Sequence, residues 1–372
     1  MQTFPAYEPI LSYAAPQRIP RTPRVGVLDT GTCAPCGLAR FAEGLARALS
    51  VDVASINAVT TGPPSQVDVA ILQYEGGITG DNVVDIIDGL RVPTIVVVHT
   101  VPKSPTSQQR SALESIAAVA DHVVVLSTAA RQRLYLTYAV DRLKVTTIPH
   151  GATLPTVPRA KRPSRPTILT WGLLRPGKGI ERVIAAMSSL RDVPGRPRYV
   201  VVGPMDPRAA VAEAEAYRDA RLEQARNLGV ADSVVFDSRY YDKSSLTDLI
   251  QQASVVVLPD DSRDQVSSGV LVDAFANGRP IVATAFPYAV ELLGTGAGMV
   301  VDHDDPIALA AALRQIITQP RLAGAMAAEV RQRAPQVGWP VVAAAYTELA
   351  QRLIAERADT RRRAAETTGF RG

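Results

Sequence analysis

Cationic side chains and glycines follow one of the β-branched runs of this sequence, at the point where a strand would end. Arg175 and Lys178 lie in "WGLLRPGKGIERV", between the run "TILT" and a helical pattern that opens near Gly179. A turn that ends at a helix N-terminus presents unpaired N–H groups and the positive end of the helix dipole to an anion. The two cationic side chains add charge beside that turn, which suits a pyrophosphate. A solvated basic turn capped by glycine is the alternative interpretation.

A second strand end is followed by a polar loop and another helical pattern, in "VVVLPDDSRDQVSSGVLVDAFANGRPIVAT". The helix would start near Ser268 or Gly269, so that backbone N–H groups point at the same cleft. Asp273 lies in the first turns of that helix, where its carboxylate could accept hydrogen bonds from the vicinal hydroxyls of a ribose or a sugar. The acidic segment 260–264 offers hard oxygen ligands that could instead bind a metal. We expect a helix-capping loop there and no metal site.

The two cysteines, Cys33 and Cys36, form a C-x-x-C pair at an expected helix start. A zinc site needs four ligands, and the sequence contains no second C-x-x-C pair. A thioredoxin-like redox pair is the stronger alternative, because a helix start lowers the pKa of a thiol. That motif belongs to a single small domain, whereas this chain has the pattern of two. We therefore predict that the sulfur atoms are incidental.

Short β-branched runs alternate with helical patterns along most of the 372 residues. The runs are apolar on both faces, as strands covered by helices on both sides must be, and the alternation predicts parallel sheets. A proline-rich stretch interrupts the alternation, which then restarts, so we predict an α/β protein with two doubly wound Rossmann-like domains facing a cleft. The predicted segments are an N-terminal extension (1–23), a first domain (24–154), a linker (155–166), a second domain (167–336), a C-terminal helix (337–357) that packs back on the first domain, and a polar tail (358–372).

Charge and motif content exclude several classes of protein. The net charge is +4, and no basic stripe with interleaved aromatic residues suggests nucleic-acid binding. The first turn, "DTGTCAPCGLARF", lacks the G-x-G-x-x-G fingerprint, and no Walker A motif is present. The sequence has no signal-peptide pattern and no apolar run of the ~18 residues that a spanning helix requires, so we expect a cytoplasmic protein. The basic segments 159–165 and 361–363 leave peripheral contact with an anionic membrane open.

The second half of the sequence resembles glycosyltransferase family 4, the retaining nucleotide-sugar enzymes of the GT-B fold. That family has a G-R-x-x-x-x-K-G turn and, later, an E-x7-E segment followed by A-x-x-x-G-x-P-V-V-A-T. Here "WGLLRPGKG" and "QVSSGVLVDAFANGRPIVAT" stand in the same order, and "TIPHG" and "GWPVVAAAY" extend the resemblance over residues 24–355. The resemblance implies a GT-B fold, with the donor on the second domain and the acceptor on the first.

The resemblance also implies roles for single residues on the donor side. Lys178 would bind the donor diphosphate, and Arg175 would assist it, because Leu173 stands where the family has an arginine. Gln265 replaces the first glutamate of the E-x7-E pair, and Asp273 replaces the second and would hold the ribose. The full set of donor-binding residues implied in this way is Gly37, Gly172, Gln265, Ser268, Gly269, Val270 and Asp273.

On the first domain the resemblance is to a mannosyltransferase-like subgroup. "CAPCGLARF" resembles a "CGIATF"-type turn, in which Gly37 would let the backbone approach the ligand closely, as glycine can. "LQYEGGITG" resembles a Q-H-E-x-G segment and places Glu75 and Gly76 beside the acceptor or the sugar, with His150 on the same side. His99 ends the run "TIVVVH" and would contact the sugar or the donor phosphate, which makes it a catalytic candidate with Arg175 and Lys178; a strand-end histidine satisfied by local backbone is the alternative.

The implied reaction is transfer of a hexose with retention of configuration, most simply mannose from GDP-mannose, to a hydroxyl of a saccharide or glycan acceptor. Fixed positive groups would stabilise the charge that develops on the leaving diphosphate, so neither a metal nor a cofactor beyond the nucleotide sugar is expected. Transfer of glucose from UDP- or GDP-glucose is the nearest alternative. A phosphorylase or epimerase of the same fold, a non-catalytic nucleotide-sugar-binding protein, and a redox protein built on the cysteine pair are the others.

Overall fold

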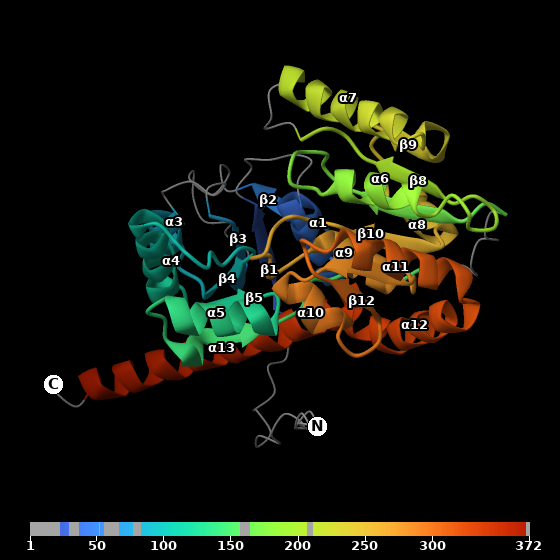
Figure 1. Cartoon of the computed structure of the whole chain (residues 1–372). Helices are drawn as coiled ribbons and strands as arrows, with labels where there is room; N and C mark the ends of the chain where they lie inside the picture. Colours follow the sequence, from blue (N-terminus) through green and yellow to red (C-terminus); the bar gives the residue numbers. More distant parts are fainter. Residues whose placement is uncertain are drawn as a thin grey trace, which may run out of the picture.

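The computed structural model of this protein describes residues 23–29, 37–51, 53–55, 67–76, 83–156, 164–206 and 211–369. Within these ranges the chain forms two α/β domains that lie side by side (Figure 1). Each domain contains a six-stranded sheet in the described residues, and all strand pairs are parallel. The predicted fold class, two doubly wound parallel-sheet domains, is therefore confirmed. Cys33 and Cys36 lie outside the described residues, as do most of the N-terminal extension and of the predicted linker.

The first domain has the strand order β2-β1-β3-β4-β5-β6. Its strands are β1 (Val25–Asp29), β2 (Val53–Ser55), β3 (Val69–Tyr74), β4 (Thr94–Val98), β5 (His122–Val125) and β6 (Val145–Thr147). Its helices are α1 (Gly37–Leu49), α3 (Val83–Gly89), α4 (Ser107–Val119), α5 (Thr128–Thr137) and the short η1 (Arg142–Lys144). The three-residue strand β2 was not predicted, because a run that short carries no periodicity.

The second domain has the strand order β12-β11-β10-β7-β8-β9. Its strands are β7 (Thr167–Trp171), β8 (Arg198–Val202), β9 (Val234–Asp237), β10 (Val255–Leu258), β11 (Ile281–Thr284) and β12 (Gly298–Val301). Its helices are α6 (Ile180–Ser188), α7 (Val211–Asn227), α8 (Lys243–Gln252), α9 (Gly269–Ala276), α10 (Pro287–Leu293), α11 (Pro306–Thr318) and α12 (Pro320–Arg333), with the short η2 (Ala231–Ser233) and η3 (Ala334–Val337). A last helix, α13 (Trp339–Gly369), follows.

The central strands are apolar on both faces because helices cover both sides of each sheet. Every residue of β4, β5, β7, β10 and β11 is buried. This burial on both faces explains why the strand sequences are continuous apolar runs and do not alternate between apolar and polar residues. In both sheets the strand order reverses beside the first strand, between β1 and β3 and between β7 and β10. A crevice forms at such a reversal, beyond the carboxyl ends of the strands, and this is where ligands bind in open α/β sheets.

The chain crosses between the domains twice, and the two crossings are bonded to each other. The backbone N–H of Ala152 donates to the carbonyl of Val337 (2.7 Å), and that of Trp339 donates to the carbonyl of Ala152 (3.0 Å). The ring of Trp339 lies so close to Gly151 that a Cβ there would approach it nearer than 3.0 Å. Only glycine therefore fits against this ring, and the two crossings form a compact joint.

The helix α13 returns from this joint to the first domain. Its residues Val342, Tyr346 and Leu349 are buried in the same apolar cluster as Phe41 and Leu45 of α1. Figure 1 shows α13 running along the first domain, with its C-terminal end extending beyond it. None of the described helices, α13 included, is long and apolar enough to cross a membrane.

The C-terminal helix was predicted to end at residue 357 and to be followed by a polar tail, but α13 continues through this polar segment to Gly369. Alanine, arginine and glutamate are strong helix formers, so this polar composition does not break a helix. Two ion pairs between residues one helical turn apart also stabilise this part of the helix. They join Arg352 to Glu356 (3.8 Å) and Asp359 to Arg362 (3.5 Å).

Hydrogen bonds tie the loop between β10 and α9 to the first domain. The hydroxyl of Ser127 donates to the carbonyl of Val266 (2.6 Å), and that of Ser267 donates to the carbonyl of His99 (2.8 Å). Beside them, the Glu291 carboxylate on α10 accepts the N–H groups of Thr128 and Ala129, at 2.9 and 2.8 Å. This carboxylate thus caps the N-terminus of α5 across the domain boundary.

Candidate functional site

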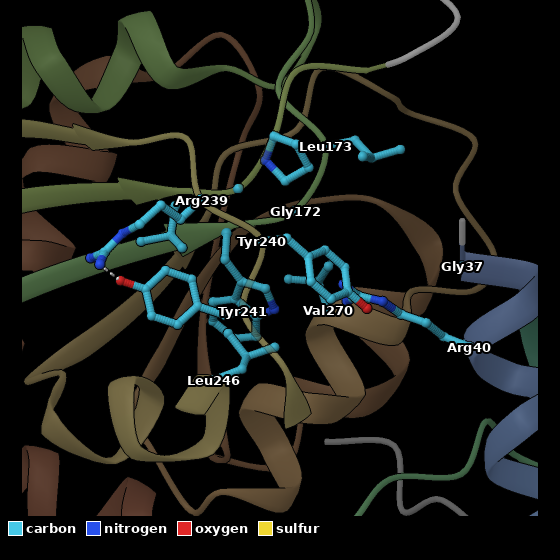
Figure 2. Close-up of a pocket in the computed structure, with 13 residues that line it drawn as sticks. Gly37, Arg40, Gly172, Leu173, Arg239, Tyr240, Tyr241, Leu246 and Val270 are labelled. Carbon is cyan, nitrogen blue, oxygen red and sulfur yellow. Dashed lines mark hydrogen bonds between the residues drawn. The ribbon is translucent and has the colours of Figure 1, made fainter. Parts of the chain in front are cut away.

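A cavity of about 180 Å³ lies at the carboxyl ends of the strands of the second sheet. Its walls come from the ends of β7 (171–173) and β8 (202–204), from the segment before α8 (239–241), and from Leu246 of α8 and Val270 of α9. Gly37 and Arg40 of α1 close it from the first domain (Figure 2). The cavity therefore lies between the domains, beside the reversal of strand order at β7.

One wall of the cavity is aromatic and cationic. The guanidinium of Arg239 donates to both carboxylate oxygens of Asp237 (2.9 and 2.6 Å), and the hydroxyl of Tyr241 donates to the same carboxylate (2.7 Å). These hydrogen bonds, from Arg239 first, hold the pKa of Asp237 well below its usual range. Tyr240, between the two, is 55% exposed, and the guanidinium of Arg40 lies over its ring at 5.1 Å from the centroid.

The helix α9 begins beside the cavity. Ser268 is its N-cap, and the hydroxyl accepts the N–H of Leu271 (3.2 Å). The Ser268 side chain therefore caps the N-terminus of α9. Further along α9, burial raises the pKa of Asp273 to about 6, while the positive charges of Arg40 and Lys243 act in the opposite direction. Asp273 thus lies in the field of two cations, one from each domain.

The glycine-rich turn after β7 is joined to the loop after β10 by a buried ion pair. The ammonium of Lys178 donates to both carboxylate oxygens of Asp260, at 3.1 and 3.2 Å, and both side chains are at most 10% exposed. Arg175 is half exposed, and its Nε lies 4.0 Å from the carboxylate of Asp206. Asp260 lies in the loop that was expected to cap a helix; the cap of α9 is Ser268 of this loop, and Asp260 is the partner of Lys178. No cluster suited to a metal ion occurs among the residues that the structure describes.

Gly179 fixes the geometry of this turn. It has a φ of +71°, and a Cβ at this position would approach the carbonyl oxygen of Pro259 nearer than 3.0 Å. The backbone N–H of Asp261 also donates to the carbonyl of Gly177 (2.9 Å). The turn and the loop after β10 are therefore in direct backbone contact, which places Lys178 against Asp260.

Two neutral histidines form a second group on the first-domain side. Phe41 lies edge-on to both His99 and His150, with ring centroids 4.8 and 5.0 Å away. His99 Nε2 is 2.8 Å from Oε1 of Gln73, and His150 Nδ1 is 2.8 Å from the carbonyl of Gly151. His150 reaches the second domain, because its Nε2 is 3.1 Å from where a Cβ on Gly269 would stand. Burial lowers the pKa of His99 to about 3 and that of His150 to about 4.

These two histidines are expected to make the protein less stable as the pH falls below about 6.5, which is their ordinary pKa. Between pH 6.5 and 4 the unfolded chain binds more protons than the folded one, so each histidine lowers the unfolding free energy by up to about 1.4 kcal/mol per pH unit. Asp273, with its raised pKa of about 6, acts in the opposite sense but is a single group. Urea unfolding at pH 7, 6 and 5 should show the decline, and His99→Gln should make it shallower. An equally steep decline in His99→Gln would contradict this account.

The structure gathers the predicted residues into three groups. Gly37, Gly172 and Val270 line the cavity, with Asp273 coupled to it through Arg40. His99, His150 and Gly269 form the second group. Glu75 lies beside this group, because its carboxylate accepts a hydrogen bond from the hydroxyl of Thr100 (3.3 Å), the residue after His99. Gly76 follows Glu75 in the sequence. Arg175 and Lys178 belong to the third group, the glycine-rich turn after β7.

Gln265 lies outside these groups, in the loop between β10 and α9 that is bonded to the first domain. Its carbonyl accepts the N–H of Tyr288 (3.2 Å). The roles of all these residues stay predictions.

Sequence reasoning missed most of the cavity wall. Its unpredicted members include Arg40, Arg239, Tyr240, Tyr241 and Leu246. "DSRYYD" begins at the last residue of a strand and combines two aromatic rings with an arginine, which was the available signal. Arg40 had none, because an arginine in the first turns of an amphipathic helix is ordinarily solvated.

Residues 157–336 match the family model described as "Glycosyl transferases group 1". The chain is 28% identical over 274 residues to a D-inositol 3-phosphate glycosyltransferase of Kineococcus radiotolerans, which covers 67% of this chain and 61% of that protein. It is 33% identical over 201 residues to the enzyme of the same name from Streptomyces griseus, covering 52% and 40%. The chain thus spans less than two thirds of the length of either relative.

Solved structures of low sequence identity share the fold over most of the chain. A sucrose-phosphate synthase from Thermosynechococcus elongatus superposes with a TM-score of 0.73 at 18% identity, covering 90% of this chain and 100% of that one. The Anabaena protein HepE, in complex with UDP and glucose, gives a TM-score of 0.70 at 17% identity, covering 88% and 99%. The two-domain arrangement is therefore that of GT-B glycosyltransferase structures.

Proposed function

From the premise that residues 157–336 match the group 1 glycosyltransferases, we propose that the protein transfers a sugar from a nucleotide sugar to a hydroxyl group. The observation that carries this proposal is the cavity between the domains. It lies at the strand reversal of the matched segment and adjoins the start of α9 and the cationic side chains of Arg40 and Arg239. A nucleotide sugar combines a planar base, a ribose and two phosphates, and each has a suitable counterpart there.

The chemistry would be electrostatic. The bond between the anomeric carbon and the diphosphate oxygen breaks, and the acceptor oxygen bonds to the same carbon, so negative charge grows on the leaving diphosphate. Lys178, Arg175 and the N–H groups at the start of α9 would stabilise that charge from fixed positions. His99 and His150 are neutral, so they would act as hydrogen-bonding groups and not as cations. We propose that configuration is retained and that the diphosphate itself accepts the acceptor's proton.

The donor and the acceptor are proposed from likeness alone. The first-domain segments resemble mannosyltransferase-like proteins, which favours a hexose and GDP-mannose, with UDP- or GDP-glucose as alternatives. The relatives are named for D-inositol 3-phosphate, which adds a phosphorylated cyclitol to the saccharides and glycans considered as acceptors. We expect no metal requirement.

A panel assay tests this proposal. Purified protein is incubated with GDP-mannose, UDP-glucose or GDP-glucose, each alone, with D-inositol 3-phosphate or with an oligosaccharide mixture, in the presence of EDTA. Release of nucleoside diphosphate with one donor, accelerated by an acceptor, is the expected result, and the anomeric configuration of the product is read by NMR. Release only after a divalent metal replaces EDTA would refute the metal-independent mechanism.

A nucleotide-sugar-binding protein without activity is the second candidate. The ion pair between Lys178 and Asp260 favours it, because the carboxylate neutralises the cation that the diphosphate would use. Gln265 also stands where the family has a glutamate. Tight nucleotide binding with no turnover of any donor, acceptor present, would support this candidate against the enzyme.

A further inference from the structure

One arginine and one tyrosine bring the two domains together across the cavity. Arg40 extends from α1 of the first domain toward Tyr240, which lies between β9 and α8 of the second (Figure 2). The guanidinium carbon is 5.1 Å from the centroid of the ring. This distance is within the ~6 Å at which a cation is attracted to an aromatic face. Both residues line the cavity.

The neighbours of Tyr240 hold it in place without covering it. Arg239 and Tyr241 are both bonded to Asp237, so the backbone on either side of Tyr240 is anchored to the end of β9. Tyr240 itself is 55% exposed, although most of the large aromatic rings within the described ranges are buried. The ring is therefore fixed at its base and open to a ligand.

The charged groups near the ring suit a polar ligand that carries a planar ring. Arg40 lies in the field of Asp273, whose pKa it lowers against the effect of burial. The cavity thus brings together an aromatic ring and a guanidinium, and this guanidinium is coupled electrostatically to a carboxylate outside the lining. An aromatic ring accepts a base of any kind by stacking, and a guanidinium stacks on flat rings as well as pairing with anions.

We propose that the base of the nucleotide stacks on Tyr240 and that Arg40 clamps it from the first domain. This inference rests on the proposed function and deepens it. Since the two residues belong to different domains, the clamp forms only when the domains approach, and nucleotide binding therefore favours the closed arrangement. Stacking is indifferent to base identity, so the pair contributes affinity for every nucleoside diphosphate rather than selecting one.

Calorimetric titration of the full chain with UDP, GDP and inorganic pyrophosphate tests the clamp. Tyr240→Ala should raise the Kd of the preferred nucleoside diphosphate by about tenfold, and Arg40→Ala by about fivefold. Tyr240→Phe should stay within about twofold of wild type, because it keeps the ring. Arg40→Lys should fall between wild type and Arg40→Ala, because it keeps the charge and loses the flat guanidinium.

Two comparisons make the test specific. The variant with both alanines should bind no more than about twofold more weakly than Tyr240→Ala, because the two side chains act as one unit. The Kd of pyrophosphate, which has no base, should not change in Tyr240→Ala. Arg47→Ala, which removes an exposed arginine further along α1, is the matched control and should bind like wild type.

The outcomes separate this inference from the function on which it rests. If wild type binds a nucleoside diphosphate and the Tyr240→Ala and Arg40→Ala variants each bind it as tightly as wild type does, the clamp is refuted and the glycosyltransferase proposal stands. Multiplicative losses in the double variant, or an equal loss in Arg47→Ala, would also refute the clamp. If wild type binds neither UDP nor GDP, the proposed function fails and the clamp fails with it.

Discussion

Replacing Lys178 by alanine is expected to lower kcat/KM for sugar transfer by about 10²- to 10³-fold, the usual effect of removing one fixed charge-stabilising group. Lys178 is the buried cation of the turn that the structure places at the end of β7, and it would face the leaving diphosphate. Its ammonium is held by both oxygens of Asp260. Steady-state release of nucleoside diphosphate, with the donor found in the panel assay, measures the effect.

The partner of Lys178 makes the single variant ambiguous, and a second variant resolves it. Removing the lysine alone leaves the buried carboxylate of Asp260 unpaired, which costs about 3–5 kcal/mol of unfolding free energy. Lys178→Ala combined with Asp260→Ala removes both charges, so we expect it to recover much of that stability while activity stays low. An active double variant would show that Lys178 serves the fold alone. Arg314→Ala with Asp192→Ala, which removes a surface pair between α11 and the turn after α6, is the control for losing an ion pair.

The second large effect is expected from Gly179→Ala, which should lower the free energy of unfolding by at least about 3 kcal/mol. Two penalties combine at this position. The residue is in the left-handed region at φ +71°, and a Cβ would overlap the carbonyl oxygen of Pro259. The backbone must move to relieve the overlap, and the turn that carries Lys178 moves with it. Activity should therefore fall even at temperatures where the variant is folded.

Gly177→Ala is the matched control for this prediction. Gly177 has a similar φ of +83°, but the nearest atom to a new Cβ is the end of the Arg175 side chain at 3.8 Å. Only the conformational penalty applies, so about 1–2 kcal/mol is expected. Urea unfolding of the two variants measures the difference. Equal losses would show that the overlap with Pro259 has no energetic weight.

The fold could be predicted because its determinants are local in sequence. Strands buried on both faces, such as β4 and β10, give continuous apolar runs, and the helices between them have their own periodicity. The polar end of α13 was misread for the opposite reason. Its residues bury little, and only their helix propensity and ion pairs show that the helix continues.

The site could be predicted only where a motif marks it. The glycines and the cations of the turn were found, but the partner of Lys178 lies 82 residues away at Asp260. The pairing of Arg40 with Tyr240 joins two domains and leaves no trace in either segment. Contacts of this kind follow from how the sheets are placed, and no spacing within one stretch of sequence records them.

The joint at Gly151 and Trp339 gives the protein a built-in optical probe. The sequence contains two tryptophans; Trp339 lies where the chain crosses between the domains, and Trp171 lines the cavity. Indole emission depends on the polarity and contacts of the ring, so one fluorophore would report a rotation of the domains and the other the arrival of a ligand. With Trp171→Phe and Trp339→Phe in hand, stopped-flow emission could time the two events separately and show which comes first.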